Sequence, residues 1–169
     1  MLRASAAEST INGRFLLLDH FGETVTDSKF NGKFRLIAFG YTHCPDVCPT
    51  SLGVITSVME NLGSDAERIQ PLFITIDPER DKASVLRNYV TYFHPKIIGL
   101  TGSKAMIERT AKNFKVRYER VVNEGDDPAQ YWMDHTASLY LIAPDGRFLT
   151  KFAYGISPKQ ILEKMERYL

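Results

Sequence analysis

The chain has 169 residues, of which 44% are hydrophobic and 24% are charged, a composition typical of a globular protein. Its net charge of +1, from 21 basic and 20 acidic residues, gives no electrostatic basis for binding nucleic acid or an anionic membrane. No run approaches the roughly 18 consecutive apolar residues of a membrane span, and residues 1–10 lack the apolar centre of a signal peptide. We therefore expect a flexible tail over residues 1–10 and a single domain over residues 11–169.

The first half of the chain predicts a hairpin followed by alternating strands and helices. Residues 13–33 contain an apolar run, a turn at Phe21-Gly22-Glu23 and the sequence Thr-Val-Thr, a pattern typical of a β-hairpin. The apolar run at 34–41 predicts a strand that is covered on both faces. Apolar residues then recur at helical spacing, at positions 52, 55, 58, 59 and 62, and Gly63 ends this helix. Strands at 71–77 and 97–102 alternate with helices at 82–94 and 103–114.

The second half is less regular before it returns to β-structure. Residues 115–122 are predicted to be extended, and residues 123–134 to form an irregular excursion. Two apolar runs within 136–155 flank Asp145-Gly146, a strong hairpin signal, and Ser157-Pro158 opens a final helix. This order predicts an α/β fold: a central mixed sheet flanked by helices, with an N-terminal β-hairpin. Ligands of such sheets bind beyond the carboxyl ends of the strands, where the first central strand leads into its helix.

Both cysteines of the chain, Cys44 and Cys48, lie in this loop, within the stretch FGYTHCPDVCPT. Three interpretations are open: a disulfide that stabilises the fold, a redox catalyst, and part of a metal site. A disulfide between residues so close in sequence adds little stability, so the stabilising role is the least favoured. If the helix begins near Cys44, Cys48 lies one turn further along the same face. The helix N-terminus then favours the thiolate form of either residue.

A specific metal site usually adds a nitrogen ligand to two sulfurs, so the four histidines of the chain are candidates. His43 adjoins Cys44, so its side chain points away from the sulfur, and we expect it to pack within the loop. His20 at the hairpin turn and His94 at a helix end are predicted to be structural. His135 stands just before an apolar strand, in the kind of loop that can face the cysteines, and is the candidate ligand.

Three motifs taken together resemble the Sco/SenC family: THCPDVCP at 42–49, DPERD at 77–81 and DHT at 134–136. They occur in the family's order, and the similarity runs from the N-terminal hairpin to the last helix. The resemblance implies a thioredoxin-like fold and a copper-binding metallochaperone of cytochrome c oxidase assembly. It also implies that copper is held by Cys44, Cys48 and His135.

This implied ligand set is chemically consistent. Soft thiolates select Cu(I), and a thiolate pair with an imidazole can also hold Cu(II). We expect Asp134 or a backbone carbonyl to orient His135 through its second ring nitrogen. Thioredoxins carry a proline where this chain carries Asp134-His135-Thr136, and they separate their cysteines by two residues rather than three. The loss of the proline and the gain of an imidazole favour a metal site over pure disulfide exchange.

A thiol–disulfide oxidoreductase remains the alternative, so whether the protein is an enzyme is open at this point. Cys44 and Cys48 would then be the catalytic redox pair, acting on cysteines of a partner protein. Cys44 is the expected attacking residue because it lies nearer the predicted helix N-terminus.

The resemblance also implies partners and a compartment. The expected acceptor is a cytochrome c oxidase subunit that carries a copper site, and another copper chaperone is the expected donor. Nucleic acid is not an expected partner, and the membrane is reached only through an N-terminal anchor that this chain lacks. The expected location is extracytoplasmic: the periplasmic face of the bacterial inner membrane or, in a eukaryote, the mitochondrial inner membrane facing the intermembrane space.

The turn at 77–81 is harder to interpret, and we assign it no ligands. Asp77 ends a buried strand at the same edge of the sheet, and it is expected to hydrogen-bond the cysteine loop. Arg80 is expected to pair with Asp81 or with a partner. The alternative is a plain strand-to-helix turn whose geometry Pro78 and Asp81 set. Met133, together with Tyr131 and Trp132, is expected to pack the nearby loop or to meet a partner rather than to bind metal.

Overall fold

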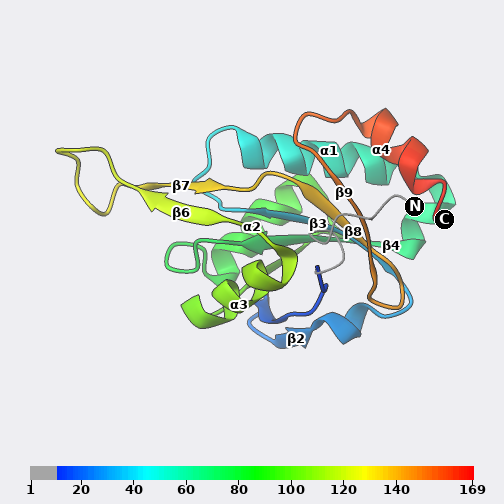
Figure 1. Cartoon of the computed structure of the whole chain (residues 1–169), viewed down its shortest axis with the longest axis horizontal. Helices are drawn as coiled ribbons and strands as arrows, with labels where there is room; N and C mark the ends of the chain where they lie inside the picture. The colour runs from blue at the N-terminus through cyan, green and yellow to red at the C-terminus, as the bar shows by residue number, and fades with distance from the viewer. Residues whose placement is uncertain (1–10) are drawn as a thin grey trace, which may run out of the picture.

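The computed structural model describes residues 11–169, so the predicted tail at 1–10 lies outside the described residues. A seven-stranded mixed sheet forms the centre, with the strand order β2-β1-β5-β4-β3-β8-β9 (Figure 1). Its strands are β1 (Leu16–Asp19), β2 (Thr24–Thr26), β3 (Phe34–Gly40), β4 (Ile69–Thr75), β5 (Ile98–Thr101), β8 (Leu139–Ile142) and β9 (Phe148–Phe152).

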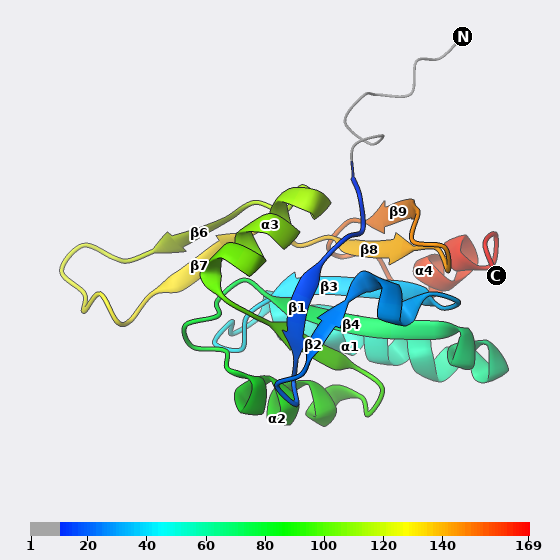
Figure 2. The same cartoon turned by 90° about the horizontal axis from the view of Figure 1, so that it is seen from below.

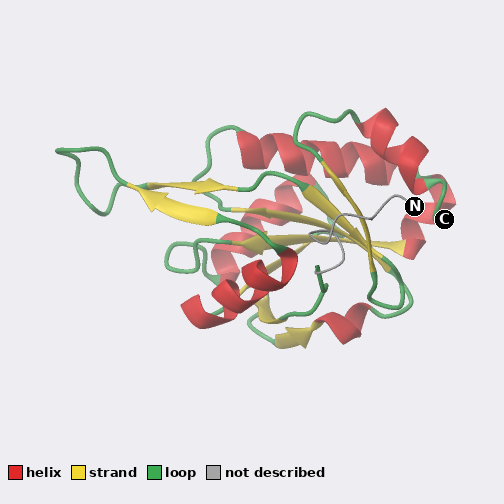
Figure 3. Ribbon diagram, viewed as in Figure 1, coloured by secondary structure: helices red, strands yellow, loops and turns green. Residues whose placement is uncertain are grey.

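Helices cover both faces of this sheet. They are α1 (Val47–Asn61), α2 (Ala83–Phe93), α3 (Lys104–Phe114) and α4 (Pro158–Met165), with short 3₁₀ helices η2 (Asp27–Phe30) and η3 (Gly63–Arg68). Helix α1 packs against α2 and α4, whereas α3 packs against β1 on the opposite face (Figure 3). The predicted arrangement of a central mixed sheet between helices is confirmed.

Strands β3 and β4 are the centre of the core. They run parallel, in a register that pairs Phe34 with Ile69 at one end and Gly40 with Thr75 at the other. All seven residues of β3 are buried, Arg35 included, which explains why the rest of the strand is apolar or glycine. Because parallel strands end at the same edge, the loops that follow Gly40 and Thr75 lie side by side. The cysteine loop and the 77–81 turn are therefore neighbours.

Local signals set several boundaries as expected. Strands β1 and β2 form the N-terminal hairpin, and β8 and β9 form the second hairpin around Gly146, whose φ of 95° suits glycine. Ser103 and Ser157 cap α3 and α4, each accepting a hydrogen bond at 3.2 Å from the backbone N–H three residues ahead. In the part of the chain that the structure describes, no helix has the length and apolar character needed to span a membrane.

A second, two-stranded sheet projects from the body (Figure 2). It pairs β6 (Tyr118–Val121) with β7 (Trp132–His135). The prediction of an irregular excursion is therefore wrong over residues 132–134, which belong to β7. Only four residues form this strand, and they follow a long turn rich in Asp, Gly and Pro that hides the signal. The alternation is nevertheless present, because Trp132 is exposed, Met133 buried and Asp134 exposed.

Candidate metal centre

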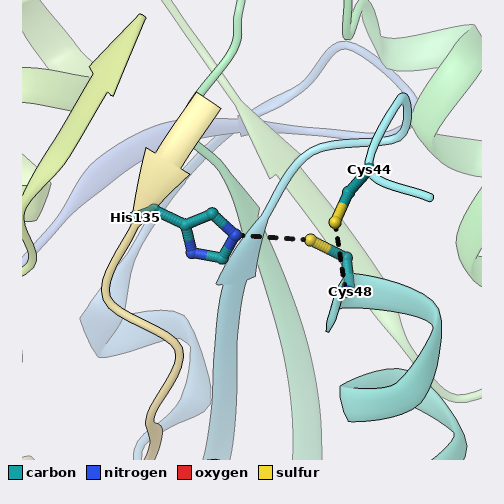
Figure 4. A group of neighbouring side chains, drawn as sticks. All are labelled: Cys44, Cys48 and His135. Atoms are coloured by element: carbon teal, nitrogen blue, oxygen red, sulfur yellow. Dashed lines mark hydrogen bonds between the residues drawn. The ribbon is translucent and has the colours of Figure 1, made fainter. Parts of the chain in front are cut away.

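The two cysteines lie where β3 leads into α1 (Figure 4). Helix α1 begins at Val47, so Cys48 lies in its first turn, while Cys44 precedes the helix rather than starting it as expected. The backbone N–H of Cys44 donates to the Tyr41 carbonyl at 3.2 Å, and that of Cys48 donates to Cys44 Sγ at 3.4 Å. Both cysteines are buried, and both are free thiols. The chain therefore turns so that the two sulfurs share one small space.

His135 reaches this space from β7. Its Nε2 lies 3.5 Å from Cys48 Sγ, and one ligand atom from each of Cys44, Cys48 and His135 lies within 4.8 Å of the other two. His135 ends a strand, which corrects the expectation that it lies in a loop. Its Nδ1 donates to the Thr136 carbonyl at 2.9 Å, so a backbone carbonyl rather than Asp134 orients the ring. This bond leaves the Nε2 lone pair facing the sulfurs.

The two thiols have very different acidities. A hydrogen bond from the Cys48 thiol is the main cause that lowers the pKa of Cys44 to about 5, although burial opposes it. The same hydrogen bond, together with burial, raises the pKa of Cys48. The opposite directions of these two pKa shifts make Cys44 the residue that loses its proton first, while Cys48 keeps its proton.

Asp81, rather than Asp77, holds the cysteine loop. One Asp81 carboxylate oxygen accepts the Thr42 N–H at 2.9 Å and the Thr75 hydroxyl at 2.7 Å, and the other accepts the Thr42 hydroxyl at 2.5 Å. Asp81 is completely buried, and burial raises its pKa. The expectation that Asp77 bonds this loop is wrong, because its carboxylate accepts hydrogen bonds from Arg80 and Tyr131 instead.

Asp77 instead pairs with Arg80 and with the β6–β7 hairpin. Arg80 Nε donates to Asp77 Oδ2 at 2.6 Å, so the expected pairing of Arg80 with Asp81 is also wrong. The Tyr131 hydroxyl donates to Asp77 Oδ1 at 2.6 Å. Asp81 N–H donates to the Asp77 carbonyl at 2.9 Å, which closes the turn between them. The motif is thus a turn, as the alternative interpretation held, with side chains that also reach two other segments.

Two residues near the site carried no functional prediction. A Cβ at Gly40 would lie 2.5 Å from Cys48 Sγ and 3.0 Å from the Phe73 ring, so only glycine leaves room for this sulfur. Tyr41 accepts the Met133 N–H at 3.1 Å on its hydroxyl, and its ring meets the His135 ring edge-on. For Gly40 the sequence did offer a signal, because a glycine ends the apolar strand four residues before Cys44.

The other histidines lie outside the cluster. His20 is buried and accepts the Gly99 N–H on Nδ1 at 3.1 Å, and His94 accepts the Lys96 N–H at 3.1 Å. His43 is exposed, with Nδ1 3.3 Å from the Thr42 hydroxyl. Met133 is buried in the hydrophobic core cluster, so it packs, as expected, but against the core. Within residues 11–169, Cys44, Cys48 and His135 form the one group of three or more such side chains close enough to hold a metal ion.

The donor set of this cluster defines its chemistry. Two sulfurs and an imidazole nitrogen are soft to intermediate ligands, which suit copper or zinc better than Mg²⁺ or Ca²⁺. A shallow hollow of about 390 Å³ that is open to solvent is lined in part by Asp134, His135 and Thr136. The same two sulfurs can also close a disulfide, which would remove them as ligands.

Comparison with known proteins identifies relatives of this chain. The sequence model of the family described as SCO1/SenC matches residues 3–169. The chain belongs to the SCO1/SenC family. A SCO2-like protein of Rickettsia felis is 46% identical to this Sco chain over 153 residues, which cover 90% of this chain and 74% of that protein. The mitochondrial SCO2 homologue of Mus musculus is 38% identical over 159 residues, which cover 93% of this chain and 62% of that protein.

Solved Sco structures have the same fold. The structure of Bradyrhizobium japonicum ScoI with copper bound has a TM-score of 0.83 and 43% identity, and the match covers 94% of this chain and 99% of that chain. The family resemblance and the thioredoxin-like fold that it implied are therefore confirmed.

Proposed function

We propose that this Sco chain is a copper chaperone of cytochrome c oxidase assembly. The observation that carries the proposal is the cluster of Cys44 Sγ, Cys48 Sγ and His135 Nε2, whose atoms lie within 4.8 Å of one another. Similarity to a ScoI protein solved with copper bound supports copper as the cargo. Residues 11–169 act in this proposal as one thioredoxin-like domain.

Each ligand has a separate task in this function. The Cys44 thiolate supplies a ready anionic donor, and Cys48 gives up its proton when the metal enters. The Nε2 lone pair of His135 completes a set that holds Cu(I) or Cu(II). Delivery is ligand exchange, in which an acceptor's thiolates or imidazoles replace these donors one at a time. A disulfide between the cysteines would block loading.

The acceptor in this proposal is a cytochrome c oxidase subunit with a copper site, and another copper chaperone is the donor. Neither nucleic acid nor a lipid surface contacts the site itself. The location is extracytoplasmic: the periplasmic face of a bacterial inner membrane, where an anchor would hold the protein, or the intermembrane space in a eukaryote. The mitochondrial name of the mouse relative supports the second compartment for eukaryotic members.

Copper titration of the reduced protein tests this function. We expect one copper per chain and, with Cu(II), a thiolate-to-copper charge-transfer band. His135→Ala should weaken Cu(II) binding by about 10- to 100-fold or more, the range found when groups around a metal are lost. His43→Ala is the matched control, because this exposed imidazole adjoins Cys44 but lies outside the cluster. Equal Cu(II) affinity in both variants would rule out the proposed ligand set.

Thiol–disulfide oxidoreductase activity is a second candidate, favoured by the low pKa of Cys44. The Cys44 thiolate would attack one sulfur of a partner disulfide, and the other partner sulfur would leave as a thiolate and take up a proton. Cys48, after losing its proton, would attack Cys44 Sγ and release the partner's second thiol. The partner is thereby reduced by two electrons, and Cys44 and Cys48 become a disulfide.

Turnover with a dithiol reductant and a peptide disulfide separates the two functions. An oxidoreductase should lose turnover with Cys44→Ser and retain it with His135→Ala. A chaperone should show little turnover in any form, together with the copper results above. Turnover by the unmodified protein with no copper binding would overturn the first proposal and support the second.

A further inference from the structure

The 77–81 turn is the element that the proposed function leaves without a role. It lies between the two parts that make the metal centre: the cysteine loop and the β6–β7 hairpin. Asp81 bonds Thr42 in the cysteine loop, two residues before Cys44. Arg80 and Asp77 bond Tyr131, four residues before His135. One five-residue turn therefore contacts both sources of the ligands.

The hairpin needs such an anchor because its own ladder is isolated. Strands β6 and β7 pair with each other in a separate sheet and not with the central one. Met133 and His135 lie on the same face of β7, and Tyr131 immediately precedes the strand; Tyr131 and Met133 are buried, and His135 is half-buried. Fixing Tyr131 and Met133 against the body therefore sets the direction in which His135 points.

Tyr131 is held on every side. Its ring lies between two guanidinium groups, 3.7 Å from that of Arg80 and 3.9 Å from that of Arg120. Its carbonyl accepts Arg80 Nη1 at 3.0 Å, and its hydroxyl donates to the buried Asp77 carboxylate at 2.6 Å. Arg120 in turn forms an ion pair with Glu79. Cation–π contacts of this kind attract each guanidinium to the face of the ring and so hold the ring in place.

We propose that the 77–81 turn fixes the separation between the thiols and the imidazole, with Arg80 and Tyr131 as positioning residues for His135. Asp81 is the positioning residue for the cysteine loop. This inference rests on the proposed copper function and assigns a task within it. Two thiolates alone can hold Cu(I), whereas Cu(II) also needs the imidazole. Loosening the Tyr131 contacts should therefore weaken Cu(II) binding selectively.

The test measures both copper oxidation states on the reduced full chain. Tyr131→Leu should weaken Cu(II) binding by about 10- to 100-fold and shift the charge-transfer band, while Cu(I) affinity stays within about 3-fold. Tyr131→Phe keeps the ring between the two guanidiniums and loses only the hydroxyl, so its effect should be intermediate. Tyr154→Leu is the control, because this exposed tyrosine lies on the segment after β9, outside the hairpin.

A second background separates positioning from general loss of structure. In His135→Ala, adding Tyr131→Leu should cause no further loss of Cu(II) affinity, because the residue acts through the imidazole. An equal loss of Cu(I) and Cu(II) affinity, or the same loss in the His135→Ala background, would overturn the proposal. If Tyr131→Leu does not fold, an unchanged band in Tyr131→Phe overturns it. Absence of any thiolate–copper band in the unmodified protein would instead reject the copper function itself.

Discussion

The cysteine loop and the β6–β7 hairpin both contribute ligands to the metal centre, but they differ in how firmly the rest of the protein encloses them. The loop leaves a strand whose residues are all buried and enters a long helix, and Cys48 is 1% exposed. The hairpin extends away from the body (Figure 1), and His135 is the last residue of its second strand, β7. One part is enclosed by the core, and the other is attached by a few side chains.

This difference separates the roles of the ligands. The sulfurs have little freedom, because Gly40, Phe73 and the first turn of α1 surround Cys48. The imidazole depends on contacts that a side-chain change can remove without disturbing the core. Thiol chemistry should therefore belong to the loop alone, and the third ligand should be adjustable.

Gly40→Ala should disrupt the packing around Cys48 in the cysteine loop. The new Cβ would lie 2.5 Å from Cys48 Sγ, so the sulfur must move, at a cost of about 3 kcal/mol in unfolding free energy. Copper stoichiometry should fall with it. Gly53→Ala is the matched control in α1, where a Cβ meets nothing within 4 Å, and it should stabilise by about 0.5–1 kcal/mol. Urea unfolding measures the stability of both variants, and copper titration measures their copper stoichiometry. Full copper binding in Gly40→Ala would contradict the close packing.

Stability of the reduced protein should depend on pH through Cys44. Its folded pKa of about 5 lies below the ordinary thiol value, so between these values the unfolded chain binds one more proton than the folded chain. Stability should rise from pH 6 to pH 8 by up to about 2 kcal/mol, and this gain is lost as pH falls towards 5. The contribution of Cys44 is isolated by measuring, at each pH, the difference in unfolding free energy between the unmodified protein and Cys44→Ala. A difference that stays constant with pH would refute the assignment.

Neighbouring residues of β7 should differ in how much they support the hairpin. Met133 is buried and Trp132 is 38% exposed, although they are adjacent. Met133→Ala should cost about 1.5 kcal/mol, less than the ~2–5 kcal/mol of a fully enclosed site, since the hairpin can settle into the space. Trp132→Ala should cost less than about 0.5 kcal/mol. Thermal unfolding of the two variants provides the comparison, and equal losses would show that both faces of the hairpin are packed.

His135→Ala should scarcely change thiol acidity. His135 makes the smallest of the named contributions to the low pKa of Cys44, and the hydrogen bond from Cys48 makes the largest. The pH midpoint of iodoacetamide alkylation should therefore shift by less than about half a unit in His135→Ala. Cys48→Ser alters the group that contributes most to the low pKa of Cys44, so this variant should raise the pH midpoint of alkylation. A large shift with His135→Ala would mean that the hairpin, not the loop, sets the acidity.

Much of the fold could be predicted because its signals are local. The apolar run of β3, the Asp145-Gly146 turn and the serine caps each involve a few adjacent residues. The short β7 escaped because its pairing with β6 spans a long turn. Likewise, sequence could place Asp77 and Asp81 at the correct edge, but only side-chain directions decide which one reaches Thr42. The family motifs predicted that Cys44, Cys48 and His135 form one site. Gly40 was not predicted, because it has no side chain that could suggest a chemical role.

The closeness of the two cysteine sulfurs, which lie within 4.8 Å of each other, has a consequence for the net charge of the buried site. At neutral pH the pair carries one proton and one negative charge, as the opposite pKa shifts of the two thiols indicate. When Cu(I) is held by both thiolates, a monovalent cation replaces that single proton, and the net charge of the pair is still minus one. Loading therefore adds no charge to a poorly solvated space, which avoids the high cost of an uncompensated ion. Cu(II) would leave the same pair neutral, so the two oxidation states should respond differently to the charge of any protein that docks beside it.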